Sequence, residues 1–259
     1  SNETPTLLPA TSYWAHRLSE RLTEVRKTGV LDFLRPDGKT AVAFEYENGK
    51  PVMIDTVVIA AQHNPDVSHA DLSEAIAAEV VNKTLPEHLI DKNTRIFINT
   101  TGRFVIGGPM GDAGVTGRKI IQDTYGGMGG HGGGAFSGKD PSPVARPAAS
   151  LTRYNTKKIV PSGQAPACEI QIAYAIGVAE PISVIASSRG LGEVPDEILT
   201  KAVREVFDMR PYYIIKELNL KTPIYGKTTC YGHFGRELPE FRWEQTDKTD
   251  ALKAAIKRM

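Results

Sequence analysis

The sequence predicts an α+β protein, in which helices pack against sheets built from hairpins. Three observations support this class. Segments with helical periodicity alternate with strand-like segments, an Asn-Gly pair separates two alternating runs, and a long strand-like region follows Cys168. Because hairpins and helices bury their apolar faces against one another, we expect layered α+β units.

The first predicted element is an amphipathic helix. Thr11 or Ser12 can cap its N-terminus, it runs to about Lys27, and Gly29 marks its end. Its apolar face consists of Leu18, Leu22 and Val25.

A hairpin and a second helix follow. Thr40–Tyr46 alternates apolar and polar residues, Asn48-Gly49 is a hairpin turn signal, and Val52–Ala61 is rich in β-branched residues. Asp71–Val81 has helical spacing, and Arg95–Asn99 reads as a strand. The apolar face of this helix is Leu72, Ile76 and Val80.

The second half predicts further helices and strands. Helical signals occur near Gly117–Thr124, after Pro147 and over Pro195–Phe207. Cys168–Ala186 reads as a strand region interrupted at Pro181, which an edge strand or a bend tolerates.

Composition limits the functional classes. The chain has 31 Lys and Arg against 30 Asp and Glu, so no overall charge draws it toward nucleic acid or membrane surfaces. Cys168 and Cys230 lack metal-site spacing and indicate a reduced intracellular protein. No apolar run reaches membrane-span length and no signal peptide is recognisable, so we expect a cytoplasmic protein.

Gly132–Asp140, with the sequence GGGAFSGKD, is the most informative segment. Glycines let backbone N–H groups approach an anion, Lys139 adds a positive charge, and Asp140 can cap a helix or face a metal. The segment does not fit GxxxxGK[ST], which needs Ser or Thr after the lysine, and GxGxxG is too common to be informative. It is therefore either a phosphate site or a glycine-rich surface loop or hinge.

This nonapeptide resembles a signature of the S-adenosylmethionine synthetase (methionine adenosyltransferase) family. Other blocks occur in that family's order and spacing, so the resemblance covers nearly the whole chain. They are Leu34–Lys39, Thr101–Pro109, Gly111-Asp112 with Thr116–Ile121, Tyr174–Pro181, Pro223-Ile224-Tyr225 and Tyr231–Arg236.

The resemblance implies a pseudo-threefold set of βαββ-type domains, with sheets packed across a dimer interface and dimers often paired into tetramers. We expect residues 1–12 to be a remnant of the first domain, 13–105 the central domain, 106–236 the C-terminal domain and 237–259 a tail. Val57-Val58-Ile59 is apolar enough for a dimer interface. Alternatively, these residues face helices of their own domain.

The implied activity is a transferase reaction. The methionine sulfur attacks C5′ of ATP and expels triphosphate, which water then cleaves to phosphate and diphosphate. Such a leaving group needs preorganised cations and metal ions, and the resemblance implies Mg²⁺ and K⁺. The cations that match the family's catalytic and ATP contacts are Lys39, Arg118, Lys119 and Lys139. Without the resemblance, Arg118-Lys119 would be read as a solvated helix face.

Other ATP contacts are carried over residue by residue. Asp37, Gly38, Arg103 and Ala135 match nucleotide contacts, and Phe104 matches the aromatic residue on adenine. Outside this context, Phe104 would be a core residue continuing the strand at 95–99, and Asp37 a turn residue.

Two more positions complete the implied site. Asp112 matches a carboxylate that contacts both ATP and methionine, where it can pair with the methionine ammonium group. Ala113 matches a backbone carbonyl near potassium.

Departures from the family pattern leave a second function open. Pro143 stands where the family has a lysine for the methionine carboxylate, and Ala145 stands where it has a magnesium aspartate. Arg146 is adjacent. Most of the first domain, with its own metal and methionine contacts, is also expected to be missing. The alternative is therefore a non-catalytic chain that binds nucleotide or assists assembly; a generic phosphotransferase lacks a candidate base.

Overall fold

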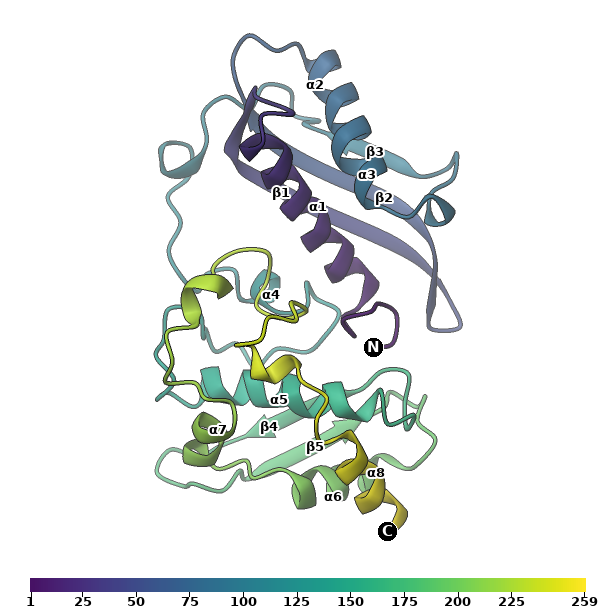
Figure 1. Ribbon diagram of the computed structural model, residues 1–259, viewed down its shortest axis with the longest axis vertical. Coiled ribbons are helices and arrows are strands. Elements are labelled where there is room, and N and C mark those ends of the chain that lie inside the picture. Colours follow the sequence, from purple (N-terminus) through teal and green to yellow (C-terminus); the bar gives the residue numbers. More distant parts are fainter. The chain divides into compact units, whose positions relative to one another are not determined.

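The computed structural model describes residues 1–259 and divides into two compact units (Figure 1). Residues 10–115 form one, here called the hairpin unit. Residues 1–9 and 116–259 form the other, here called the glycine-loop unit. The predicted four-part division at 12, 105 and 236 stays a prediction of domain organisation.

The hairpin unit contains a three-stranded sheet in the order β1-β2-β3, antiparallel between β1 and β2 and parallel between β2 and β3. Asn48 and Gly49 both have positive φ, 50° and 76°, and join paired residues Glu47 and Lys50. These angles fit the two-residue turn expected for Asn-Gly. The elements are α1 (Ala10–Lys27), β1 (Leu34–Glu47), β2 (Lys50–His63), α2 (His69–Ile76), the π-helical turn η1 (Ala77–Val81), α3 (Asn82–Thr84), β3 (Arg95–Ile98) and the 3₁₀ turns η2 (Glu87–Leu89) and η3 (Gly108–Met110).

The core of the hairpin unit lies between the sheet and its helices. Val57 and Ile59 are buried in this core, whereas Val58, between them in β2, is 40% exposed. The period of two in a strand explains the difference, because successive side chains point to opposite faces. The helix residues in the same core are Leu18, Leu22, Val25, Leu72, Ile76 and Val80. Both predicted helical faces are confirmed.

One local expectation for the hairpin unit was wrong, and one alternative reading is excluded. Helix α1 begins at Ala10, so Thr11 and Ser12 lie within its first turn rather than capping it. Strand β3 ends at Ile98, and Phe104 lies in the following loop. Asn99 has φ 45°, which turns the chain out of the strand direction.

The glycine-loop unit contains a two-stranded antiparallel sheet of β4 (Glu169–Ala173) and β5 (Ser183–Ser187). Helix α5 packs on β4, and α6 packs on β5 and on α8. Pro181 lies in the connection between the strands, which explains the interruption in the predicted strand region. The helical elements are α4 (Ile120–Asp123), α5 (Ala145–Ile159), α6 (Asp196–Val206), α7 (Pro211–Glu217), α8 (Thr249–Lys257) and the 3₁₀ turns η4 (Tyr225–Thr228) and η5 (Arg242–Glu244).

Helix α5 begins at Ala145, before Pro147 rather than after it. Pro147 is tolerated because N–H groups in the first helical turn have no intrahelical partner. The helix is almost entirely buried and forms the centre of the glycine-loop unit.

Residues 1–9 belong to the glycine-loop unit through contacts with α5. The Arg153 guanidinium donates to the carbonyl oxygens of Thr6 (2.6 Å) and Leu7 (2.9 Å). Leu8 is buried beside Gly235, where an added Cβ would lie only 2.1 Å from a Leu8 methyl carbon.

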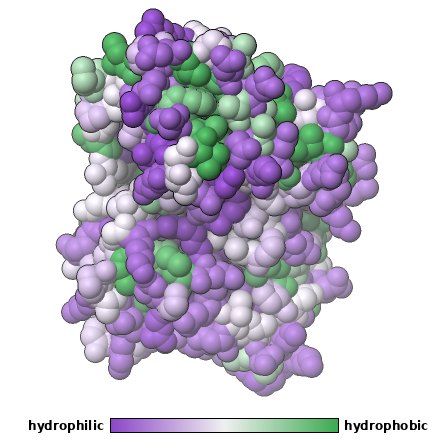
Figure 2. All heavy atoms as spheres, turned by 45° about the horizontal axis from the view of Figure 1, so that its top comes forward, coloured by the Kyte–Doolittle hydropathy of each residue, from purple (hydrophilic) through white to green (hydrophobic).

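The surface in Figure 2 is mostly hydrophilic with small apolar groups. No helix is both long and apolar enough to cross a membrane.

Candidate functional site

The predicted ATP contacts of the hairpin unit gather around the start of β1 and residues 103–108. Gly38 and Lys39 in β1 are exposed and pair with Ala61 and Ala60 of β2. Asp37 is half-buried, and the Gly108 N–H donates to its Oδ2 (2.8 Å). The Asp37 carboxylate therefore fixes the backbone of the chain segment that carries Arg103 and Phe104.

Gln62 reinforces this attachment. Its Nε2 donates to the Val105 carbonyl (2.9 Å), and its Oε1 accepts a hydrogen bond from the Asp37 N–H (3.4 Å). A Cβ at Gly107 would lie 2.7 Å from Gln62 Cδ and 3.1 Å from Asp37 Cβ. Glycine is therefore required for the backbone to approach β1 and β2 this closely.

His63 holds Phe104 by its backbone. The Phe104 N–H donates to His63 Nε2 (3.1 Å), while His63 N–H donates to the Phe104 carbonyl (3.0 Å). Because Nε2 accepts, the proton lies on Nδ1, which is 2.7 Å from the Asn64 carbonyl. The Phe104 ring is half-buried and Arg103 is exposed. Asp112 and Ala113 follow η3 and are both exposed.

The glycine-loop unit carries the remaining predicted contacts. Arg118 and Lys119 are exposed and precede α4, so they do not form the helix face considered as their alternative reading. Ala135 and Lys139 lie on either side of Phe136, which is 1% exposed. The Lys139 N–H donates to the Phe136 carbonyl (3.1 Å), and Gly138 has φ 85°. Positive φ at the third residue is what a type II turn requires and glycine allows.

An aromatic cluster holds Phe136 in place. Its ring packs edge-on against His233, with centroids 4.8 Å apart, and His233 stacks on Trp243 at 4.9 Å. Burial lowers the pKa of His233 to about 3, so this imidazole is neutral at pH 7. Phe136 thus anchors a loop whose neighbouring glycines are exposed.

Arg146 lies beneath the same loop. It is 4% exposed, its Nη1 donates to the Lys139 carbonyl, and its guanidinium carbon is 3.9 Å from the Tyr225 ring centroid. Burial lowers the pKa of Arg146, although the nearby carboxylates of Asp123 and Asp140 act against this. Being buried, Arg146 does not take the place of the surface lysine that the family pattern has at exposed Pro143.

The carboxylates of this chain do not form a metal site. No group of three His, Cys, Asp or Glu side chains is close enough to hold a metal ion. Asp140 instead accepts from the Ser142 N–H (2.7 Å), and hydrogen bonds from Ser142 lower its pKa. A Mg²⁺ ion at a nucleotide site is usually held by one or two carboxylates together with substrate phosphates and waters, so any such ion here would depend mainly on the phosphates.

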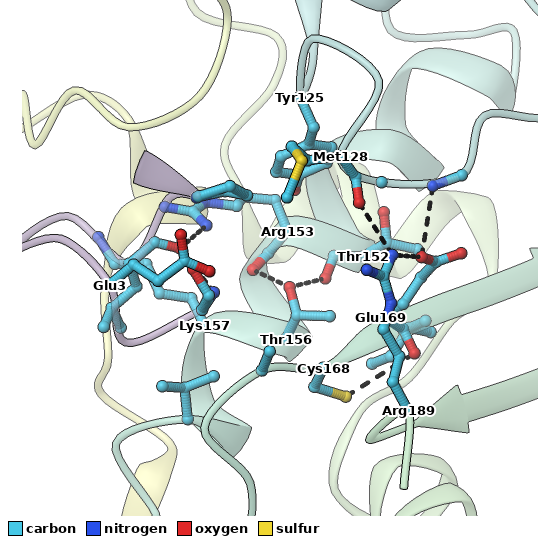
Figure 3. A pocket seen from close by; sticks show the side chains of 18 residues that line it. Glu3, Tyr125, Met128, Thr152, Arg153, Thr156, Lys157, Cys168, Glu169 and Arg189 are labelled. Atoms are coloured by element: carbon cyan, nitrogen blue, oxygen red, sulfur yellow. Dashed lines mark hydrogen bonds and ion pairs between the residues drawn. The ribbon is translucent and has the colours of Figure 1, made fainter. Parts of the chain in front are cut away.

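A cavity of about 140 Å³ lies elsewhere in the glycine-loop unit (Figure 3). Arg189 and Glu169 face each other at its edge, 2.6 Å apart, and Arg189 also donates to the Met128 carbonyl (2.9 Å). Burial raises the pKa of Cys168, on the cavity wall, to about 12, so its thiol is protonated. None of the predicted ATP contacts lines this cavity.

The sequence did not predict the buried charges beside this cavity, two of which, Arg153 and Lys157, line it. Glu244 contacts Arg153 (2.8 Å) and Lys157 (2.9 Å), and all three side chains are nearly inaccessible. Gly235 N–H also donates to Glu244 (2.8 Å). The local sequence signal for this cluster is weak. Arg153 and Lys157 are four residues apart and share a helical face, and such a pair of cations is equally typical of a solvent-exposed face.

The predicted site residues therefore fall into two groups. The hairpin unit contains Asp37, Gly38, Lys39, Arg103, Phe104, Asp112 and Ala113, and the glycine-loop unit contains Arg118, Lys119, Ala135 and Lys139.

Comparison with known families identifies the family to which this chain belongs. The family model for the S-adenosylmethionine synthetase C-terminal domain matches residues 106–245, and that for the central domain matches residues 1–104. The chain belongs to the S-adenosylmethionine synthetase family. The predicted resemblance and α+β fold class are thereby confirmed.

Similar family members are named S-adenosylmethionine synthase. The relative from Solidesulfovibrio magneticus is 68% identical over 256 residues, 99% of this chain and 66% of that protein. The relative from Nitratidesulfovibrio vulgaris strain Miyazaki F is 66% identical over 99% of this chain and 66% of that protein. The relative from Syntrophobacter fumaroxidans is 54% identical over 97% of this chain and 65% of that protein. The chain thus spans just under two thirds of these curated relatives.

Proposed function

We propose that this chain functions as an S-adenosylmethionine synthetase and that its own cationic residues bind the triphosphate of ATP. The reaction consumes ATP, L-methionine and water, and it forms S-adenosylmethionine, phosphate and diphosphate. The sulfur–C5′ bond forms as the C5′–oxygen bond to triphosphate breaks, and water then cleaves the triphosphate. The observation that carries the proposal is Lys139 on a turn fixed by buried Phe136 and Arg146, in a chain 68% identical to a named synthase.

The residue roles follow from the chemistry of the leaving group. Exposed Arg118 can bind phosphate oxygens in a bidentate manner, while the lysines act as point charges that stabilise triphosphate as it leaves. These lysines are Lys39, Lys119 and Lys139. We propose that Phe104 packs on adenine, beside Arg103.

Further contacts to ATP and methionine complete the proposal. We propose that Asp112 pairs with the methionine ammonium group and also contacts ATP, and that Ala135 contacts ATP by its backbone. Mg²⁺ and K⁺, the latter near the Ala113 carbonyl, remain proposals from the family resemblance. The side chains of this chain do not form a group of three His, Cys, Asp or Glu residues that could hold a metal ion by themselves.

We also propose a homodimer, which can pair into a tetramer. The β2–β3 face that carries Val58 and Phe97 supports this, because these side chains are 40% and 39% exposed. Apolar side chains on an open sheet face are typical of subunit interfaces. Light scattering after size-exclusion chromatography distinguishes monomer, dimer and tetramer.

Three measurements test the proposed function. Intact masses of all polypeptides in the purified material establish what accompanies this chain, and S-adenosylmethionine formation from ATP and labelled methionine is then assayed in that material. Tripolyphosphate titration of the chain tests its triphosphate site. We expect Lys139→Ala to weaken binding at least about tenfold without lowering the melting temperature, while exposed Lys201→Ala in α6 has no effect. Equal affinity of both variants would overturn the assignment.

The second candidate is a nucleotide-binding or assembly partner without catalysis. Pro143 and Ala145 favour it, because neither side chain can bind the methionine carboxylate or a metal ion. The double substitution Pro143→Lys and Ala145→Asp separates the candidates in the purified assembly. Methionine-dependent turnover that rises from a measurable wild-type rate supports the synthetase. Absent turnover in both proteins, with tripolyphosphate still bound, supports the partner.

A further inference from the structure

Arg146 is a buried cation without a direct carboxylate partner. No carboxylate oxygen lies within ion-pair distance of its guanidinium, and its buried Nε has no hydrogen-bond partner. Its direct contacts are the Lys139 carbonyl and the face of Tyr225, while Asp123 and Asp140 act on its charge from beyond ion-pair distance. A buried charge without an ion-pair partner is costly, so the contacts that Arg146 does make need a structural explanation.

The carbonyl that Arg146 contacts belongs to the turn that presents Lys139. Phe136 fixes the first end of this turn by burial, and its carbonyl accepts from the Lys139 N–H (3.1 Å). Arg146 fixes the other end through the Lys139 carbonyl. Between them, Gly138 at φ 85° contributes no side-chain anchor. The orientation of Lys139 therefore depends on two buried side chains, one aromatic and one cationic.

Tyr225 supports Arg146 from the opposite side. Its ring lies 3.9 Å from the guanidinium carbon, and its hydroxyl donates to the Leu220 carbonyl (2.6 Å), which fixes the ring. An arginine stacked on an aromatic face and directed at a carbonyl has little rotational freedom left. Tyr225 thereby restricts where Arg146 can donate.

We propose that Arg146, seated on Tyr225, is a positioning residue that orients the Lys139 turn to receive the triphosphate. This proposal rests on the proposed function and extends it to a residue that is buried beneath the loop. It also explains why an unpaired arginine is buried at the first turn of α5.

Arg146→Met removes the charge and keeps most of the side-chain volume. Tripolyphosphate should bind about tenfold more weakly, and amide hydrogen exchange should accelerate in peptides covering residues 136–142, with little change elsewhere. Arg146→Lys should recover part of both, because a lysine can still donate to the Lys139 carbonyl. Lys227→Ala, an exposed change near Tyr225, should alter neither measurement.

The double variant Arg146→Met/Lys139→Ala tests whether Arg146 acts through Lys139. If it does, the double variant binds tripolyphosphate about as weakly as Lys139→Ala alone, because the second change removes a contact already lost. Losses that multiply to about a hundredfold would mean that Arg146 acts independently and would overturn the positioning role.

Two outcomes separate this inference from the proposed function. If the wild-type protein does not bind tripolyphosphate, the proposed triphosphate site is wrong. If hydrogen exchange at residues 136–142 is unchanged in Arg146→Met, Arg146 does not hold the turn, and the inference is overturned whether or not tripolyphosphate binds. If Arg146→Met does not fold, Tyr225→Leu takes its place, since it leaves the charge but removes the supporting ring. It should weaken binding and accelerate the same exchange, and unchanged values for both would refute the inference.

Discussion

The two segments that carry the predicted ATP contacts are fixed by different kinds of interaction. In the hairpin unit, residues 99–108 are attached to the sheet mainly by hydrogen bonds. The Asn99 side chain accepts from the Ala61 N–H (2.7 Å) and donates to its carbonyl (2.9 Å). In the glycine-loop unit, buried charges and aromatic rings dominate, with Glu244 and Phe136 as examples.

This contrast predicts different responses to mutation. Several modest hydrogen bonds share the attachment of residues 99–108, so losing one should leave most of it intact. Buried charges act as a group, because removing one partner leaves the others desolvated and uncompensated. The glycine-loop unit should therefore show the largest single effects.

The largest expected effect is that of Glu244→Ala. Arg153 and Lys157 would lose their shared buried partner, and we expect the free energy of unfolding of the glycine-loop unit to fall by about 3–5 kcal/mol. Urea unfolding followed by Trp243 fluorescence measures this, in a Trp14→Phe background that removes the other tryptophan, in the hairpin unit.

The matched control is Glu205→Ala, which breaks an exposed ion pair with Arg258 in the same unit. Exposed pairs are worth about 0–1 kcal/mol, so this variant should lie close to the parent. If Glu244→Ala and Glu205→Ala lowered stability equally, the contrast drawn between the two segments would be wrong.

The second prediction concerns pH. The pKa of His233 falls from 6.5 unfolded to about 3 folded, so the unfolded state binds more protons as the pH drops and stability is lost between these values. Wild type should lose about 2 kcal/mol more than His233→Phe between pH 7 and pH 5. Buried Lys158, whose pKa is lowered to about 6, also destabilises as pH falls, but equally in both proteins. Parallel stability curves for the two proteins would contradict the prediction.

The regular elements could be predicted because their signals are local. The spacing of Leu18, Leu22 and Val25 determines the buried face of α1, and Asn48-Gly49 determines the hairpin turn. α7 and α8 are not among the helices predicted from the sequence, although Pro211 begins α7 and apolar residues in α8 have helical spacing. Their short lengths make such signals easy to overlook.

The supports of the candidate site could not be predicted, because they are long-range. The family resemblance named Lys139, but nothing near Arg146 indicates that it is buried against Tyr225, which is distant in sequence. Similarly, Asp37 was predicted as a nucleotide contact, whereas its hydrogen bond to Gly108 depends on how residues 99–108 return to β1. Burial of charge is a property of the packed unit and not of a local pattern.

The third prediction tests the turn at Lys139. Gly138→Ala places a Cβ 2.7 Å from Thr116 Cγ2 in a residue with φ 85°, and we expect a cost of about 1–2 kcal/mol. The turn should open locally, so hydrogen exchange should accelerate at residues 136–142 while Trp243 fluorescence stays native. Gly132→Ala is the control, since its Cβ would meet open space and its φ is not positive. Equal exchange in both variants would show that the Gly138 conformation does not hold the turn.

The smallest effect is expected at Asp37, in the hairpin unit. Asp37→Ala removes the acceptor for the Gly108 N–H and should lower stability by about 1 kcal/mol, because Gln62 and His63 still hold residues 104 and 105. Asp37→Asn keeps an acceptor oxygen and should recover most of this loss. Hydrogen exchange over residues 103–110 measures the release directly. A loss in Asp37→Ala as large as that of Glu244→Ala would mean that one carboxylate, rather than a shared set of hydrogen bonds, fixes this segment, and the two units would then be stabilised alike.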